Sequence, residues 1–154
     1  MNSSKFQRII PLIIIILLFR CNTLIGKDPS IFKELFSNKA VSGYDTVAYF
    51  TEGKPVKGDS KIISNYRGAV WQFSSPANKE KFDTSPERFI PQYGGYCAWA
   101  VSQNYIASAN PNYWKIVDGK LYLNYNADVQ KNWEKDIPGF IQKANKNWPA
   151  VLQK

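Results

Sequence analysis

Two stretches of this chain alternate apolar and polar side chains with the period of a β-strand, and each is followed closely by a second such stretch. Residues 61–66 and 69–73 form the first pair, and residues 113–117 and 120–125 form the second. Asp118-Gly119, between the members of the second pair, is the kind of residue pair that a two-residue type I′ turn requires. The pattern therefore predicts two antiparallel hairpins.

The second hairpin has its most regular apolar positions on one side of the sheet. Leu121, Leu123 and Tyr125 alternate with polar or amphipathic neighbours. Such alternation is typical of an antiparallel sheet with one face on the core and the other in water. We therefore predict a hairpin with one solvated face.

Short helices are predicted before, between and after the hairpins, from capping residues followed by helical spacing. A capping residue followed directly by proline stands before residues 31–36 and at the start of residues 75–82 and 85–89. Asp45 is placed to cap a turn over residues 47–50, and Asn126 and Asp136 begin the last helices. The interleaved hairpins and helices predict a small single α+β domain of short antiparallel hairpins packed with short helices.

The start of the chain has a different pattern, which predicts export. Lys5 and Arg8 precede an apolar run over residues 9–19, too short to span a bilayer and typical of a secretory signal. Leu18-Phe19-Arg20-Cys21 resembles a bacterial lipobox, although Arg20 stands where a small residue is usual. We expect a lipoprotein-type signal peptide over residues 1–20, with Cys21 acylated; an uncleaved anchor and ordinary secretion are the alternatives.

The rest of the chain then divides into residues 21–40, a tether with a short helix, and a domain over residues 41–150. The expected location is the bacterial cell envelope, as a membrane-anchored lipoprotein or a periplasmic protein. Its expected partners are the membrane, through the N-terminal lipid, and an unknown small ligand or envelope protein.

The amino-acid composition excludes several reaction mechanisms and kinds of metal site. The chain contains no histidine, which excludes Ser-His-Asp and Cys-His nucleophilic mechanisms, zinc sites of the Cys/His kind and histidine-ligated haem. The net charge is +8, but three of the 20 basic residues precede Cys21, which leaves 17 against 12 acidic residues. That excess is modest for a nucleic-acid binder, and with export it predicts no nucleic-acid partner.

Residues 93–100 concentrate the remaining candidate chemistry, because they contain Cys97 among aromatic residues and the pair Gly94-Gly95. Free cysteine usually packs as a small apolar residue, so a buried Cys97 is one interpretation, and a disulfide to Cys21 is another. The third is a loose metal or redox site for copper or iron, with Cys97 the only soft ligand. Its oxygen partners would come from Tyr44, Asp45, Tyr93 and Tyr96.

Several motifs in a consistent order resemble one known family. They are GYDTVAYF at residues 43–50, YRGAVWQFSS at residues 66–75, SPERF at residues 85–89, PQYGGYCA at residues 91–98, VDGKLYLNY at residues 117–125 and WEKDIPG at residues 133–139. From residue 41 to about residue 148 the chain resembles the YHS-domain proteins, specifically their small exported bacterial branch.

This resemblance implies a fold more firmly than a function. Metal-handling YHS domains bind metal through cysteines, and the matching places here look like residues 44–47, Ser74 and Asn78. None is cysteine, so the thiolate cluster that Cu(I) needs is missing. We therefore expect an exported binding or accessory module without catalytic activity. The alternative is a copper- or iron-binding or redox protein that uses Cys97 with nearby tyrosine and aspartate.

Overall fold

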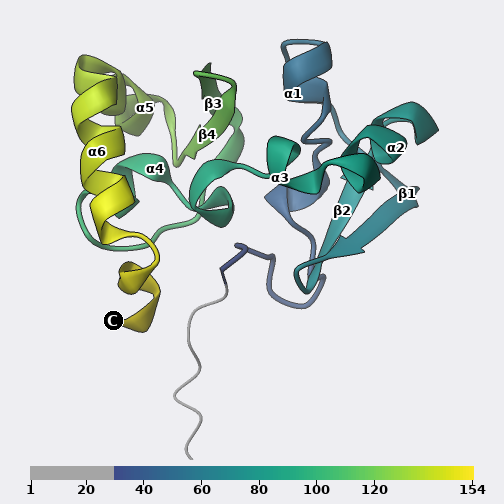
Figure 1. The fold of residues 1–154 in the computed structure, drawn as a ribbon, viewed down its shortest axis with the longest axis horizontal. Coiled ribbons are helices and arrows are strands. Elements are labelled where there is room, and N and C mark those ends of the chain that lie inside the picture. The colour runs from purple at the N-terminus through teal and green to yellow at the C-terminus, as the bar shows by residue number, and fades with distance from the viewer. Residues whose placement is uncertain (1–29) are drawn as a thin grey trace, which may run out of the picture.

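The computed structural model describes residues 30–154, so the predicted signal peptide and Cys21 lie outside the described residues (Figure 1). In chain order the elements are η1 (Val41–Gly43), α1 (Ala48–Thr51), β1 (Asp59–Tyr66), β2 (Ala69–Phe73), α2 (Pro76–Thr84), α3 (Pro86–Phe89), η2 (Gln92–Gly95), α4 (Ala98–Ser102), β3 (Asn110–Val117), β4 (Lys120–Asn124), α5 (Ala127–Trp133), η3 (Glu134–Asp136), α6 (Ile137–Asn147) and η4 (Ala150–Gln153). Short helices and two antiparallel hairpins confirm the predicted α+β class.

The first hairpin pairs β1 with β2 as the sequence predicts. Arg67 and Gly68 both have positive φ angles, of 49° and 69°, at the turn between the strands. Trp71 and Phe73 lie on one face of β2, and their rings lie 5.1 and 5.0 Å from that of Phe82 in α2. Packing of α2 against this face encloses one end of the core.

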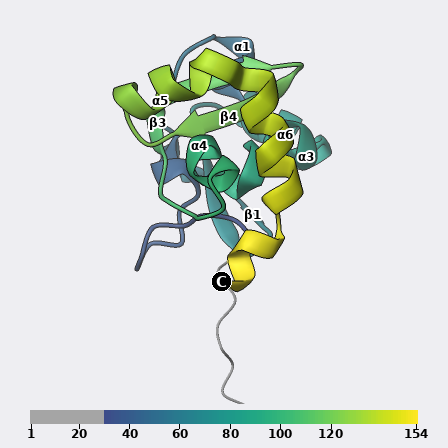
Figure 2. The ribbon, with the colours of Figure 1, turned by 90° about the vertical axis from the view of Figure 1, so that its left-hand side faces the viewer.

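The second hairpin confirms the predicted turn but not the solvated face. Asp118 and Gly119 have φ angles of 50° and 71°, as a type I′ turn requires. Leu121 and Leu123 enter the core shared with the first hairpin, while Tyr122 points the other way, with its ring 5.5 Å from that of Trp133. The expectation of one solvated face is wrong, because α4, α5 and α6 cover it (Figure 2).

Helix caps are the local signals that predicted most of the helices. Ser75 accepts a hydrogen bond from the Asn78 amide at the start of α2, and Asn126 accepts one from the Val129 amide at the start of α5. Asp136 does the same for Gly139 in α6. Each cap pairs an amide that the first turn of the helix leaves without a partner.

The helix predicted over residues 31–36 is absent. The chain instead turns back on itself, with the Glu34 amide donating to the Lys39 carbonyl at 3.1 Å. The returning residues 38–40 pair with β2: the Ala40 amide donates to the Val70 carbonyl at 2.9 Å, and the Val70 amide donates to the Asn38 carbonyl at 2.8 Å. The free edge of β2 offers unpaired backbone groups, and their pairing with residues 38–40 fixes this turn, which outweighs the weak propensity of the six residues before it for a helix.

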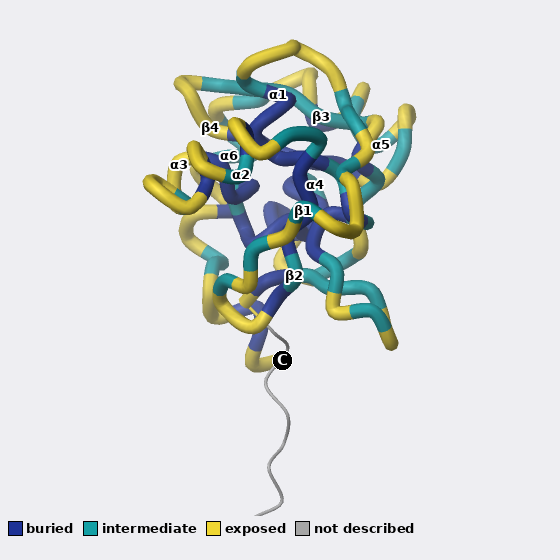
Figure 3. Tube along the Cα trace, turned by 90° about the vertical axis from the view of Figure 1, so that its right-hand side faces the viewer, coloured by how far each residue is buried: buried dark blue, intermediate teal, exposed yellow. Residues whose placement is uncertain are grey.

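Two clusters of buried side chains form the interior, one on each side of β4. Figure 1 shows β1, β2, α1 and α2 at one end of the molecule and α4, α5 and α6 at the other. The buried part of the chain runs through the centre, and the outer turns are exposed (Figure 3). No helix in residues 30–154 combines the length and apolar character needed to cross a bilayer.

Candidate functional site

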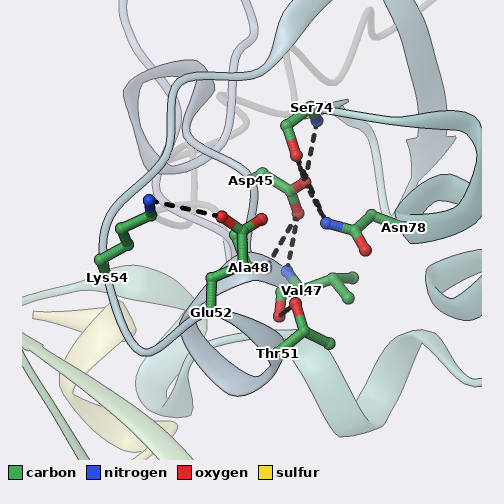
Figure 4. A network of polar contacts seen from close by, with 8 residues as sticks. All are labelled: Asp45, Val47, Ala48, Thr51, Glu52, Lys54, Ser74 and Asn78. Atoms are coloured by element: carbon green, nitrogen blue, oxygen red, sulfur yellow. Dashed lines mark hydrogen bonds and ion pairs between the residues drawn. The ribbon is translucent and has the colours of Figure 1, made fainter.

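Asp45 is a buried carboxylate between η1 and α1, and its two oxygens are used differently (Figure 4). Oδ1 accepts hydrogen bonds from the Val47 amide at 2.9 Å and the Ala48 amide at 3.2 Å. These bonds confirm that Asp45 caps the turn of helix that follows it. A buried charge needs such donors, since burial without them costs several kcal/mol.

The second oxygen, Oδ2, joins this cap to the end of β2 and the start of α2. It accepts from the Ser74 amide at 2.8 Å, from the Ser74 hydroxyl at 2.7 Å and from Asn78 Nδ2 at 2.8 Å. We call Asp45, Ser74 and Asn78 the polar triad (Figure 4). With the two capping bonds, five donors surround one carboxylate, so its acceptor sites are fully engaged.

The polar triad brings together residues 44–47, Ser74 and Asn78, the places where the sequence resemblance puts the cysteines of metal-handling domains. Here the side chains of Ser74 and Asn78 both donate to Asp45 Oδ2. Hydroxyl and amide groups are also poor ligands for a soft metal such as Cu(I). The triad therefore does not fit that metal, and residues 30–154 contain no group of three or more Cys, Asp or Glu able to hold another.

A comparison with known families matches the segment that begins just after Asp45. The family model of the YHS domain matches residues 47–93. The chain carries a YHS domain. The match runs from the residue before α1 into η2, so it includes Ser74 and Asn78, while Asp45 lies two residues before it. Comparison with curated proteins and with solved structures finds no match.

Cys97 lies just outside the matched YHS segment, at the start of α4, where it is buried and free. Its Sγ is 3.8 Å from Asn124 Oδ1, and burial raises the pKa of the thiol. A cavity of about 200 Å³ borders it, lined by Trp99, Ala100, Tyr105, Ala107, Tyr125 and Val129. Its proposed oxygen partners Tyr44, Asp45, Tyr93 and Tyr96 are absent from that lining.

Tyr93 and Tyr96 belong to the core beneath the helices rather than to a site around Cys97. Both rings pack against Trp148, with centroids 5.9 and 6.0 Å from its ring. The Tyr93 hydroxyl donates to Asn145 at 2.9 Å, and burial, followed by the neighbouring Tyr122, raises its pKa. The five candidate residues are thus distributed over the polar triad, this core and two cavities, and no single site joins them.

Tyr44 lines the other cavity, which sequence reasoning did not anticipate. This cavity has a volume of about 580 Å³, and we call it the amide cavity. It is lined by Ser42, Tyr44, Ser108, Ala109, Asn110, Pro111, Asn112, Tyr113, Tyr125 and Asn126. The run Asn110-Pro111-Asn112-Tyr113 was the available signal, because asparagine and tyrosine side chains beside a turn are suited to binding polar ligands. The alternation of apolar and polar residues predicts only a strand that begins at residue 113.

Proposed function

We propose that this protein is an exported YHS-domain module, held at a membrane of the cell envelope by a lipid on Cys21, which binds a ligand and catalyses no reaction. The polar triad carries this proposal. Asp45 accepts five hydrogen bonds. It does so at the positions where the sequence resemblance places the cysteine thiols of metal-handling YHS domains. A carboxylate saturated in this way holds the domain together and has no acceptor left for an ion or a substrate proton.

The second candidate function, a metal or redox site at Cys97, has less support. A raised thiol pKa disfavours the thiolate, which is the form that binds metals and reacts. The groups near its sulfur are the Asn124 amide oxygen, the side chains of the small cavity, and the backbone of Trp99, Ala100 and Tyr125, whose hydrogen bonds lower the thiol pKa less than burial raises it. This environment favours a neutral thiol that packs in the interior.

The turn between residues 33 and 39 supports attachment near a membrane. Leu35 and Phe36 are 81% and 98% exposed, and this part of the chain projects from the body of the molecule (Figure 2). Lys33 and Lys39 flank them. Exposed apolar side chains beside basic ones suit the interfacial region of an anionic bilayer, and the turn follows Cys21 by fewer than twenty residues.

Two measurements on the full chain test this function. Mass spectrometry of the mature N-terminus is expected to find an acylated Cys21, whereas an intact Met1 or an unmodified Cys21 would refute the lipid anchor. Metal analysis of protein purified without added metal is expected to find less than about a tenth of an equivalent. Stoichiometric copper or iron that is lost in Cys97→Ser would establish the metal or redox alternative instead.

A further inference from the structure

We propose that the amide cavity binds a neutral carbohydrate. This inference rests on the proposed function in one respect, since it names the ligand class of the binding module. It is carried by the amide cavity itself: its size, the unpaired polar groups on its walls, its aromatic rings and its lack of charge.

Several hydroxyl groups on the walls of the cavity have no hydrogen-bond partner in the described chain, while the Asn112 side chain donates to that of Asn110 at 3.1 Å. The hydroxyl groups of Tyr44, Tyr113 and Tyr125 make no hydrogen bond to another part of residues 30–154, and those of Ser42 and Ser108 make none either. Asn126 uses its oxygen to cap α5, which leaves its Nδ2 free to donate. Hydroxyl and amide groups that both donate and accept match the hydroxyl groups of a sugar, which also do both.

The tyrosines add flat apolar surface to these polar groups. Tyr125 is 52% exposed, and it lies just after β4 at the border between the amide cavity and the Cys97 cavity, both of which it lines. The face of an aromatic ring is its electron-rich side and attracts weakly positive C–H groups. A sugar ring presents such C–H groups on its faces and hydroxyl groups at its rim, so it can contact both kinds of surface at once.

The electrostatics of the cavity favour an uncharged ligand. No Asp, Glu, Lys or Arg from the described part of the chain lines it. Lys57 is the nearest basic group that the contacts identify: its Nζ lies 4.5 Å from the centre of the Tyr44 ring and donates to the Ser42 carbonyl at 2.8 Å. That ammonium group lies over the Tyr44 ring and is not part of the cavity lining, so an ionised ligand would lose water without gaining a charged partner on the walls.

The second large cavity of the described chain has the opposite character. It has a volume of about 520 Å³ between α1, α2 and α3, and Glu80, Lys81 and Arg88 line it beside Phe50 and Phe89. The amide cavity, with a volume of about 580 Å³, is within the usual size range of small-ligand sites. The amide cavity is therefore the one whose chemistry selects a neutral polyhydroxyl compound.

The test uses the full-length protein in a detergent without a sugar headgroup, titrated with neutral maltotriose, N-acetylated chitotriose and anionic trigalacturonate. Saturation-transfer NMR and calorimetry are expected to find saturable binding of a neutral trisaccharide and weaker binding of the anionic one. Tyr125→Ala should weaken that binding about tenfold, which is 1.4 kcal/mol, and Tyr125→Phe, which keeps the ring, should weaken it less.

Tyr105→Ala is the matched control, because Tyr105 is a tyrosine of similar exposure, 47%, that lines the Cys97 cavity but not the amide cavity. It should bind the trisaccharide as the wild type does, as should Cys97→Ser. The inference is overturned if neither neutral trisaccharide saturates the protein below about 20 mM, if trigalacturonate binds more tightly, or if Tyr125→Ala binds as the wild type. Those results leave the acylation and metal measurements untouched, so the two proposals fail separately.

Discussion

Replacing Asp45 with asparagine is the most informative single substitution in the polar triad, because it keeps the shape of the side chain and removes its charge. In the wild type both carboxylate oxygens accept, two bonds at Oδ1 and three at Oδ2. An asparagine has only one accepting oxygen. Whichever way its amide turns, its NH₂ group faces donors from the backbone or from Asn78.

The size of the effect follows from those contacts. If the amide oxygen keeps the two capping bonds, the Ser74 amide and Asn78 Nδ2 lose their acceptor, while the Ser74 hydroxyl can rotate to another. Losing a hydrogen bond to a charged group, and leaving a buried donor unpaired, costs about 1.5–3 kcal/mol for each donor. Two such donors give an expected loss of about 3–6 kcal/mol in the free energy of unfolding of Asp45→Asn, much of the total of a small domain.

Urea or guanidinium unfolding, followed by tryptophan fluorescence and far-UV circular dichroism, measures this change. Asp136→Asn is the matched control: Asp136 also caps a helix, α6, but is exposed, and asparagine caps as well as aspartate does. We expect the control to remain within about 0.5 kcal/mol of wild type. A loss below about 1 kcal/mol for Asp45→Asn would refute the reasoning that the triad is a saturated structural unit.

Three further predictions concern other parts of the molecule. Gly94→Ala should lower the free energy of unfolding by more than about 3 kcal/mol, because φ is +62° and the new Cβ would collide with the Ser30 carbonyl. The control Gly119→Ala, at φ +71° with open space around it, should lower that free energy by only about 1–2 kcal/mol. Alkylation of Cys97 at pH 8, followed by peptide mass spectrometry, should be at least about tenfold slower than that of a free thiol, since burial raises its pKa, and should accelerate as pH rises. Phe36→Ser, at an almost fully exposed position, should change the unfolding free energy by less than about 0.5 kcal/mol but reduce the hydrogen-exchange protection of residues 33–39 on anionic nanodiscs; unchanged protection would contradict membrane contact by this turn.

The features that the sequence predicts well are those whose cause is local. Asp118-Gly119 requires two positive φ angles, and the structure has them. The side chains of Asn126 and Asp136 cap α5 and α6, each by accepting a hydrogen bond from the backbone amide three residues ahead. In each case the residues that determine the conformation lie within one turn of one another, so their pattern is visible in the printed sequence.

The failures have a non-local cause. Residues 31–36 have a helix-like spacing, but the Phe32 amide donates to the Gly94 carbonyl, and residues 38–40, which pair with the edge of β2, hold the chain in a turn. Tyr122 alternates with Leu121 and Leu123 like a solvent-facing residue, yet helices later in the chain bury it against Trp133. No window along the sequence contains the element that decides either outcome.

The candidate site divides in the same way. Family resemblance identified residues 44–47, Ser74 and Asn78 as corresponding positions, and the structure brings three of them into direct contact. Grouping Cys97 with Tyr44 and Asp45 had no such basis, and the fold separates them. The amide cavity could not be predicted as a whole, because its walls come from η1, the loop before β3, the start of β3 and the residues after β4.

The polar triad and the amide cavity are linked through adjacent residues. Asp45 follows Tyr44 directly, and its carboxylate fixes the backbone that turns from η1 into α1. Its amide donates to the Val56 carbonyl at 2.8 Å, which holds the segment carrying Lys57 against Tyr44. A rigid wall loses less entropy when a ligand binds than a mobile one does. The positions where the resemblance places the cysteines of metal-handling domains would thus contribute here through structure, by positioning Tyr44 beside the cavity for which we propose a ligand.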